Sequence, residues 1–195
     1  MKIGILSLQG DFKAHAWVLR RLGVDPVEVR HAEQLSSVTG LILPGGESTT
    51  MLKLIELEDL HKPLVEFSTR YPVLGICAGA ILMAAEVHSP AQHSLGFMDM
   101  TIERNAYGRQ IESSIRSVEP EDDFTQRTAV GPIEAAFIRA PKIRRIGEKV
   151  KVLATDGGTP ILVEQDHLMA ATFHPELSDE QRIHTLFLNK AQPAS

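Results

Sequence analysis

Strand-like apolar runs alternate along this chain with segments whose apolar residues recur at helical spacing. The first run covers residues 3–8, and a helix-spaced segment follows over residues 12–22 and stops at Gly23. Glycine at that point suits the left-handed backbone that commonly ends a helix. Such an alternation is typical of a largely parallel sheet with helices on both faces. We therefore predict an α/β fold with three layers, α/β/α, around a mostly parallel central sheet.

The same pattern predicts the bounds of other elements. Asp11 is placed to cap the first helix, and Ser48 or Thr49 is placed to cap a second. The acidic stretch 119–124 is either a solvated loop or part of a docking surface, and its composition favours the loop. Further strands are expected at residues 27–30, 40–43 and 72–76, and helices at residues 48–57, just before residue 72, at 77–86 and at 178–190.

Composition limits the organisation and the partners of the chain. The 195 residues are 43% hydrophobic and 23% charged, which suits one domain over residues 1–190 and a disordered tail at 191–195. The net charge of −5 and the scattered basic residues do not favour nucleic acid as a partner. No apolar run approaches the roughly 18 residues of a membrane span, and the start lacks the features of a signal peptide. We expect a cytoplasmic protein that does not bind membranes.

The single cysteine of the chain, Cys77, stands between two glycines in the segment "GICAG". It follows a predicted strand and precedes a predicted helix, and in α/β sheets ligands bind beyond such strand ends. A helix N-terminus favours the thiolate form of cysteine, which is the nucleophile. Gly75 and Gly79 have the spacing of a nucleophile elbow. A small buried side chain is the alternative interpretation of this cysteine.

His174 is the histidine placed best to act as the base. It ends an apolar run, and Pro175 favours extended backbone before it, so that His174 and Glu176 can point to the same side. Glu176 could then orient the imidazole, which would complete a nucleophile, a base and an orienting group. Alternatively, the segment "HPE" ends a strand and Glu176 caps the next helix. Four other histidines are expected at the surface: His61, His88, His93 and His184.

Backbone N–H groups near two strand ends could stabilise a developing oxyanion. Gly45 and Gly46 end one predicted strand, and the N–H of Ala78 follows the cysteine. A tight turn is the alternative interpretation of the segment "PGG".

Six segments of the chain resemble one family when they are taken together. They are "GILSLQGDF", "LILPGGESTTM", "GICAGAILMA", "IERNAYGRQIESS", "FIRAP" and "FHPEL", in that order over nearly the whole chain. The set resembles the class I (triad) glutamine amidotransferases, and within them the glutaminase subunits of pyridoxal 5′-phosphate synthase. Ile76 departs from the threonine usual in that family's elbow, whereas Cys77, Ala78 and Gly79 match it.

The resemblance implies a flavodoxin-like three-layer fold and a glutaminase reaction through a glutamyl thioester. Cys77 would attack the side-chain amide of L-glutamine, and His174 would protonate the leaving ammonia and then activate water. Gln9 and Gly10, in the loop after the first strand, would help to complete the oxyanion site with Gly46 and Ala78. The resemblance places these residues in the glutamine pocket: Gly45, Gly46, Glu47, Ser48, Arg104, Ile138 and Arg139. It implies no metal and no cofactor.

The resemblance also implies a partner. Ammonia would pass to a PdxS-type (β/α)₈ synthase subunit in a large hetero-oligomer, and that partner would switch on the glutaminase. Two alternatives remain open on the residues alone. One is a cysteine hydrolase or peptidase of similar fold acting on another acyl substrate, and the other is a non-catalytic regulatory module. The presence of both Cys77 and His174 argues against the second alternative.

Overall fold

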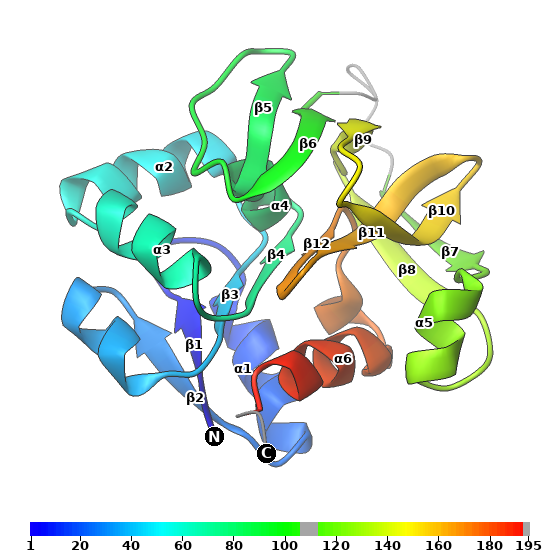
Figure 1. Ribbon diagram of the computed structural model, residues 1–195, viewed down its shortest axis with the longest axis horizontal. Coiled ribbons are helices and arrows are strands. Elements are labelled where there is room, and N and C mark those ends of the chain that lie inside the picture. The colour runs from blue at the N-terminus through cyan, green and yellow to red at the C-terminus, as the bar shows by residue number, and fades with distance from the viewer. Residues whose placement is uncertain (106–112, 193–195) are drawn as a thin grey trace.

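A seven-stranded sheet lies at the centre of the computed structural model, which describes residues 1–105 and 113–192. Its strand order is β10-β11-β12-β4-β3-β1-β2 (Figure 1). The strands from β12 to β2 are parallel, whereas β10, β11 and β12 pair antiparallel. The bounds are β1 Lys2–Leu6, β2 Asp25–Val29, β3 Leu41–Leu43, β4 Val73–Ile76, β10 Lys151–Asp156, β11 Thr159–Gln165 and β12 Leu168–Ala171.

Helices cover both faces of this sheet, because successive side chains of each buried strand point to opposite sides. On β3, Leu41 and Leu43 pack in one cluster with α2, α3 and α4, whereas Ile42 packs in the other with α1, α5 and α6. The predicted three-layer α/β/α architecture with a mostly parallel sheet is confirmed. The helices are α1 Phe12–Arg21, α2 Ser48–Leu57, α3 His61–Ser68, α4 Ala78–Met83, α5 Asp122–Arg127 and α6 Arg182–Lys190, and the 3₁₀ segments are η1 Ala32–Ser37 and η2 Pro175–Leu177.

Two smaller sheets, which the sequence pattern did not predict, add to this core. One has the order β5-β6-β9 and the other pairs β7 with β8 (Figure 1). These sheets position two arginines, because β6 leads into Arg104 and β8 leads into Arg139. The bounds are β5 Ala84–His88, β6 Met98–Glu103, β7 Ser113–Val118, β8 Ile133–Ile138 and β9 Lys142–Ile146.

The caps or bounds of four helices differ from the prediction. The helix expected at residues 77–86 spans only Ala78–Met83, because the chain continues as strand β5 from Ala84. Glu47, rather than Ser48 or Thr49, caps α2, because its carboxylate accepts hydrogen bonds from two backbone N–H groups of the first turn. The last helix begins at Arg182 instead of residue 178. Asp11 does stand at the N-cap of α1, but its side chain makes no capping hydrogen bond there.

Two segments that we expected to be solvated are partly buried. The acidic stretch 119–124 runs into α5, which buries the side chain of Phe124 completely. The expected tail begins at Ala191, which is buried and ends α6, whereas residues 193–195 lie outside the described part of the chain.

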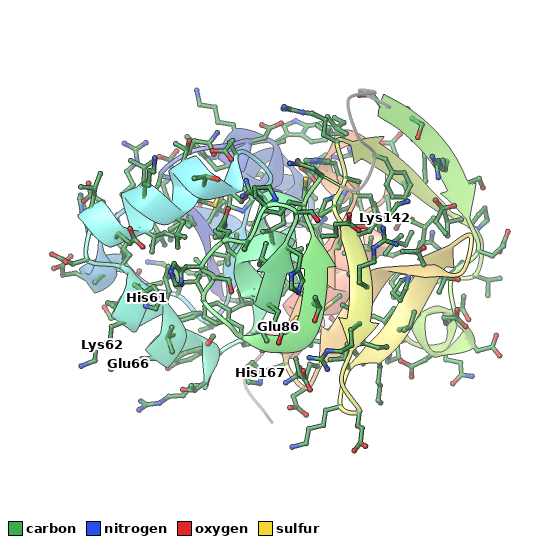
Figure 2. The ribbon with its side chains drawn as sticks, turned by 90° about the horizontal axis from the view of Figure 1, so that it is seen from above. His61, Lys62, Glu66, Glu86, Lys142 and His167 are labelled. Carbon is green, nitrogen blue, oxygen red and sulfur yellow. The ribbon has the colours of Figure 1, made fainter. Side chains whose placement is uncertain are left out.

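The outer surface of α3 is polar. Figure 2 shows Lys62 and Glu66 projecting from it, and these residues form an i,i+4 ion pair of 3.7 Å. Across the residues that the structure describes, no helix combines the length and the apolar character needed to cross a membrane.

Candidate active site

Four loops meet at one edge of the central sheet, because the carboxyl ends of its parallel strands point the same way. Gln9 follows β1, the segment 45–48 follows β3, Cys77 follows β4 and His174 follows β12. They line a cavity of about 360 Å³ together with residues that follow β6 and β8. The lining includes all seven residues predicted for the glutamine pocket: Gly45, Gly46, Glu47, Ser48, Arg104, Ile138 and Arg139.

Cys77 occupies a strained turn between β4 and α4. Its φ of 50° and ψ of −100° are unusual for a residue with a side chain, as at a nucleophile elbow. The flanking glycines permit close approach of neighbouring atoms. A Cβ on Gly79 would lie 2.1 Å from the carbonyl oxygen of Leu43, and one on Gly75 would lie 2.5 Å from the sulfur of Met83. The unusual dihedral angles of the elbow therefore belong to Cys77, and the glycines provide the room for close packing.

His174 and Glu176 come together as the sequence predicted. His174 Nδ1 lies 2.7 Å from Glu176 Oε1, and both residues are buried. The backbone differs from the extended chain that we expected, because Pro175–Leu177 forms a 3₁₀ turn after His174. The backbone of His174 is also held in place, because its N–H donates to the carbonyl of Ala136 at 2.8 Å.

The electrostatics of this pair favour a charged imidazole. Burial alone would lower the pKa of His174, but hydrogen bonds to Cys77 and Glu176 raise it to about 10. Burial likewise opposes ionisation of Glu176, yet His15 and His174 hold the pKa of this carboxyl below its ordinary value. His174 is therefore protonated at neutral pH, and Glu176 is ionised beside it.

The loops after β1 and β3 pack tightly against each other. Gln9 Oε1 accepts the backbone N–H of Glu47 at 3.0 Å, and the carbonyl of Gly45 accepts the N–H of Asp11 at 3.1 Å. Gln9 and Gly46 line the cavity, but Gly10 and Ala78 are not among its lining residues. The oxyanion role of all four residues stays a prediction.

Two opposite charges, Arg104 and Glu47, lie side by side in the cavity that Cys77 also lines. One nitrogen of the Arg104 guanidinium lies 2.8 Å from Thr49 Oγ1 and 3.3 Å from Glu47 Oε1. Burial opposes ionisation of Glu47, but hydrogen bonds from Thr50 and Thr49 lower its pKa to about 2. This end of the cavity can therefore pair with both charges of a zwitterionic amino acid.

Sequence reasoning missed four lining residues: Asp11, Ile81, Asn105 and Leu177. Each is close in sequence to a residue that we did select, which was the available clue. The expectation that His184 lies at the surface was wrong, since its side chain is fully buried, whereas His61, His88 and His93 are exposed. Within residues 1–105 and 113–192, no group of three or more His, Cys, Asp and Glu side chains is placed to hold a metal ion.

Known proteins match this chain over nearly its whole length. The SNO glutamine amidotransferase family matches residues 5–192. A relative from Solibacter usitatus, named pyridoxal 5′-phosphate synthase subunit PdxT, is 58% identical over 97% of this chain and 98% of its own length. A relative of the same name from Koribacter versatilis is 50% identical over 96% of this chain and 94% of its own. A solved structure described as a glutamine amidotransferase has a TM-score of 0.88 at 42% identity, covering 97% of this chain and 98% of its own.

Proposed function

The chain belongs to the SNO glutamine amidotransferase family, and from this premise we propose that it is the glutaminase subunit of a pyridoxal 5′-phosphate synthase. It hydrolyses L-glutamine to L-glutamate and ammonia. One observation supports the assignment of roles: Cys77, on its strained elbow, lines the same cavity as His174, which is paired with Glu176 behind it. We propose Cys77 as nucleophile, His174 as acid and base, and Glu176 as the group that orients the imidazole.

The reaction proceeds in two halves. The Cys77 thiolate attacks the side-chain amide carbon of glutamine, a carbon–sulfur bond forms, and the carbonyl oxygen becomes an oxyanion. As the intermediate collapses, the carbon–nitrogen bond breaks and the imidazolium of His174 gives its proton to the leaving ammonia. Neutral His174 then takes a proton from water, the hydroxide attacks the thioester, and the carbon–sulfur bond breaks to release glutamate and the thiolate.

Three charged lining residues are proposed to bind the α-carboxylate and α-ammonium groups of glutamine. Arg104 and Arg139 suit the α-carboxylate, since a guanidinium donates paired hydrogen bonds to a carboxylate. Glu47 stays ionised to low pH and suits the α-ammonium group. Backbone N–H groups at Gly46 and Ala78, with the loop of Gln9 and Gly10, are proposed to stabilise the oxyanion.

Ammonia is of use only where an acceptor receives it. We propose that it passes to a PdxS-type (β/α)₈ subunit in a large hetero-oligomer, and that docking of this subunit completes the oxyanion site around Gln9 and Gly10. The isolated chain is then weakly active. A nucleophilic thiol without a disulfide partner suits a reducing compartment, and we place the reaction in the cytoplasm.

The test is release of glutamate from glutamine by the wild type and by Cys77→Ala, each alone and with a PdxS-type subunit. We expect weak activity of the isolated wild type, strong stimulation by the partner, and none with Cys77→Ala in either mixture. Full activity of the wild type without partner would contradict the activation by docking. Absence of glutaminase from every mixture would contradict the proposed substrate.

A second measurement separates the substrate from the nucleophile. A diazoketone analogue of glutamine alkylates a catalytic thiol, and the chain has only one cysteine, so intact mass reports on Cys77 alone. We expect stoichiometric labelling that excess glutamine prevents and excess asparagine does not. Labelling that glutamine fails to prevent would favour another acyl substrate, as in a cysteine hydrolase or peptidase.

A further inference from the structure

Two fully buried histidines lie beside Glu176, and one of them approaches the carboxylate oxygen that also contacts His174. His15 comes from α1 and His184 from α6, and neither is exposed to solvent. Their rings meet with 3.0 Å between His15 Nδ1 and His184 Nε2. The other ring nitrogen of His15, Nε2, lies 3.6 Å from Glu176 Oε1. Cys77, His174, Glu176, His15 and His184 thus form one continuous row from the cavity into the core.

His15 and His184, unlike His174, are neutral. Burial is the largest influence on the pKa of His15 and lowers it, helped by His174 and opposed by Glu176 and Asp11. Burial also lowers the pKa of His184 to about 3, helped by His15 and opposed by Glu176. A neutral imidazole has one N–H donor and one acceptor nitrogen, so each ring of the pair can carry its proton on either of two atoms.

Only one arrangement of the two protons leaves no buried donor without an acceptor nearby. If His184 Nε2–H donates to His15 Nδ1, the proton of His15 is on Nε2 and faces the Glu176 carboxylate. His184 Nδ1 is then a bare acceptor, which is the less costly group to leave unpaired. In the opposite arrangement a lone pair of His15 faces the carboxylate and a buried N–H of His184 has no partner in the described structure. The first arrangement is therefore favoured.

We propose that His15 is a positioning residue of the glutaminase reaction. His184 fixes its tautomer, and the Nε2–H of His15 keeps Glu176 ionised and aimed at His174. The inference rests on the proposed function, because it assigns a role within that mechanism. The contact of 3.6 Å is electrostatic and longer than a hydrogen bond, and such contacts commonly tighten when substrate binds.

The need for a second group beside Glu176 arises in the middle of the reaction. When His174 gives its proton to ammonia, Glu176 loses the cation that compensates its charge. The side chain of Glu176 has no exposure to solvent, and its Oε2 atom has no hydrogen-bond partner in the described structure. A buried carboxylate in that position would take up a proton and lose its hold on His174. The N–H of His15 opposes this protonation, together with the Nδ1–H that neutral His174 keeps toward Glu176 and the backbone N–H of Glu176.

The test compares two substitutions of His15 in the complete glutaminase–synthase complex. His15→Leu removes the donor at similar volume, whereas His15→Gln keeps an amide N–H at a similar reach. We expect His15→Leu to lower kcat for glutaminase by about ten- to a hundredfold, with KM for glutamine changed less than about twofold. The acid limb of its pH–kcat profile moves to higher pH, because Glu176 is protonated more easily. His15→Gln restores most of kcat and the acid limb.

Two further variants separate positioning from folding. His184→Leu leaves the donor of His15 but no longer fixes the tautomer, so we expect a smaller loss of kcat. Val18→Ala, a buried apolar substitution on the same helix, lowers the melting temperature without moving the acid limb. Wild-type kcat and acid limb in His15→Leu would overturn the proposal. Equal loss in His15→Leu and His15→Gln would also overturn it, since shape and not the donor would then matter.

A readout without glutamine keeps this test separate from the proposed function. The rate at which iodoacetamide alkylates Cys77 depends on its thiolate form, which the charged His174 stabilises. We expect the dependence of this rate on pH in the isolated chain to differ between His15→Leu and the wild type, because Glu176 holds His174 less firmly without the donor. Superimposable profiles would overturn the role of His15 whether or not the chain hydrolyses glutamine.

Discussion

The backbone of Gly45 lies directly against the imidazole of His174, so that a Cβ atom on Gly45 would stand 2.4 Å from His174 Cε1. Gly45 does not have a positive φ, so alanine fits its backbone and only the imidazole is in the way. We expect Gly45→Ala to displace His174 from Cys77 and to lower kcat by about a hundredfold. Steady-state kinetics of the complete complex, with circular dichroism to verify the fold, measure this effect.

A matched glycine provides the control for that substitution. Gly157 has a φ of 54°, and a Cβ there would meet no atom within 4 Å. Gly157→Ala therefore introduces backbone strain of about 1 kcal/mol without a steric clash, and we expect lower stability with unchanged kcat. Normal kcat in Gly45→Ala would show that His174 does not need the position found here.

Glu47 has two separable roles, as the cap of α2 and as the proposed partner of the substrate ammonium. Glu47→Ala removes both, so we expect a loss of about 1 kcal/mol in the free energy of unfolding and a rise of about tenfold or more in KM for glutamine. Glu47→Ser restores a capping oxygen but not the charge. Urea titration should therefore show recovered stability in Glu47→Ser, while its KM stays high. Recovery of KM in the serine variant would assign Glu47 to the fold alone.

Arg139 is a residue with a side chain in left-handed backbone, with a φ of 46°. Glycine has no steric penalty there, so we expect Arg139→Gly to raise the free energy of unfolding by about 1 kcal/mol and to raise KM for glutamine. Arg139→Ala removes the guanidinium but keeps the strain, and it should raise KM equally without added stability. If both variants bind glutamine as the wild type does, Arg139 does not contact the substrate.

The central sheet could be predicted because its parallel strands carry their own signal. Strands such as β3 and β4 are buried on both faces and appear in the sequence as short apolar runs between helical segments. The smaller sheets are marked less clearly, although β8 also contains a short buried apolar run. Ser113–Val118 is mostly exposed and pairs with a strand that begins at residue 133, so its place depends on pairing between distant segments.

The residues of the site also divide into those that the sequence predicts and those that it does not. Cys77, His174 and Glu176 could be selected because reactive side chains at strand ends have a limited set of uses. The burial of His184 could not be read from its polar neighbours, because its partner His15 is 169 positions away. A clue did exist: His184 stands three and four residues before Phe187 and Leu188, on the apolar face of α6.

Burial of His15 and His184 as neutral groups makes the stability of the protein depend on pH. Both have pKa values below the ordinary 6.5 in the folded state, that of His184 falling to about 3. Below pH 6.5 the unfolded chain therefore binds more protons than the folded chain, and the free energy of unfolding falls as pH falls. The opposite shift of His174, to about 10, stabilises the fold fully below pH 6.5, and this stabilisation is lost as pH rises from 6.5 toward 10.

The window between pH 6.5 and 4.5 isolates this contribution of the two histidines. Glu47 and Glu176, whose pKa values are lowered from 4.5, begin to lose their stabilising effect only below that window. We expect the free energy of unfolding to fall there by about 1.4 kcal/mol per pH unit for each proton taken up. Urea titrations of the wild type, His184→Leu and the His15→Leu/His184→Leu double variant should give successively shallower slopes. An equally steep slope in the double variant would mean that other groups take up the protons, and that the buried pair does not control acid stability.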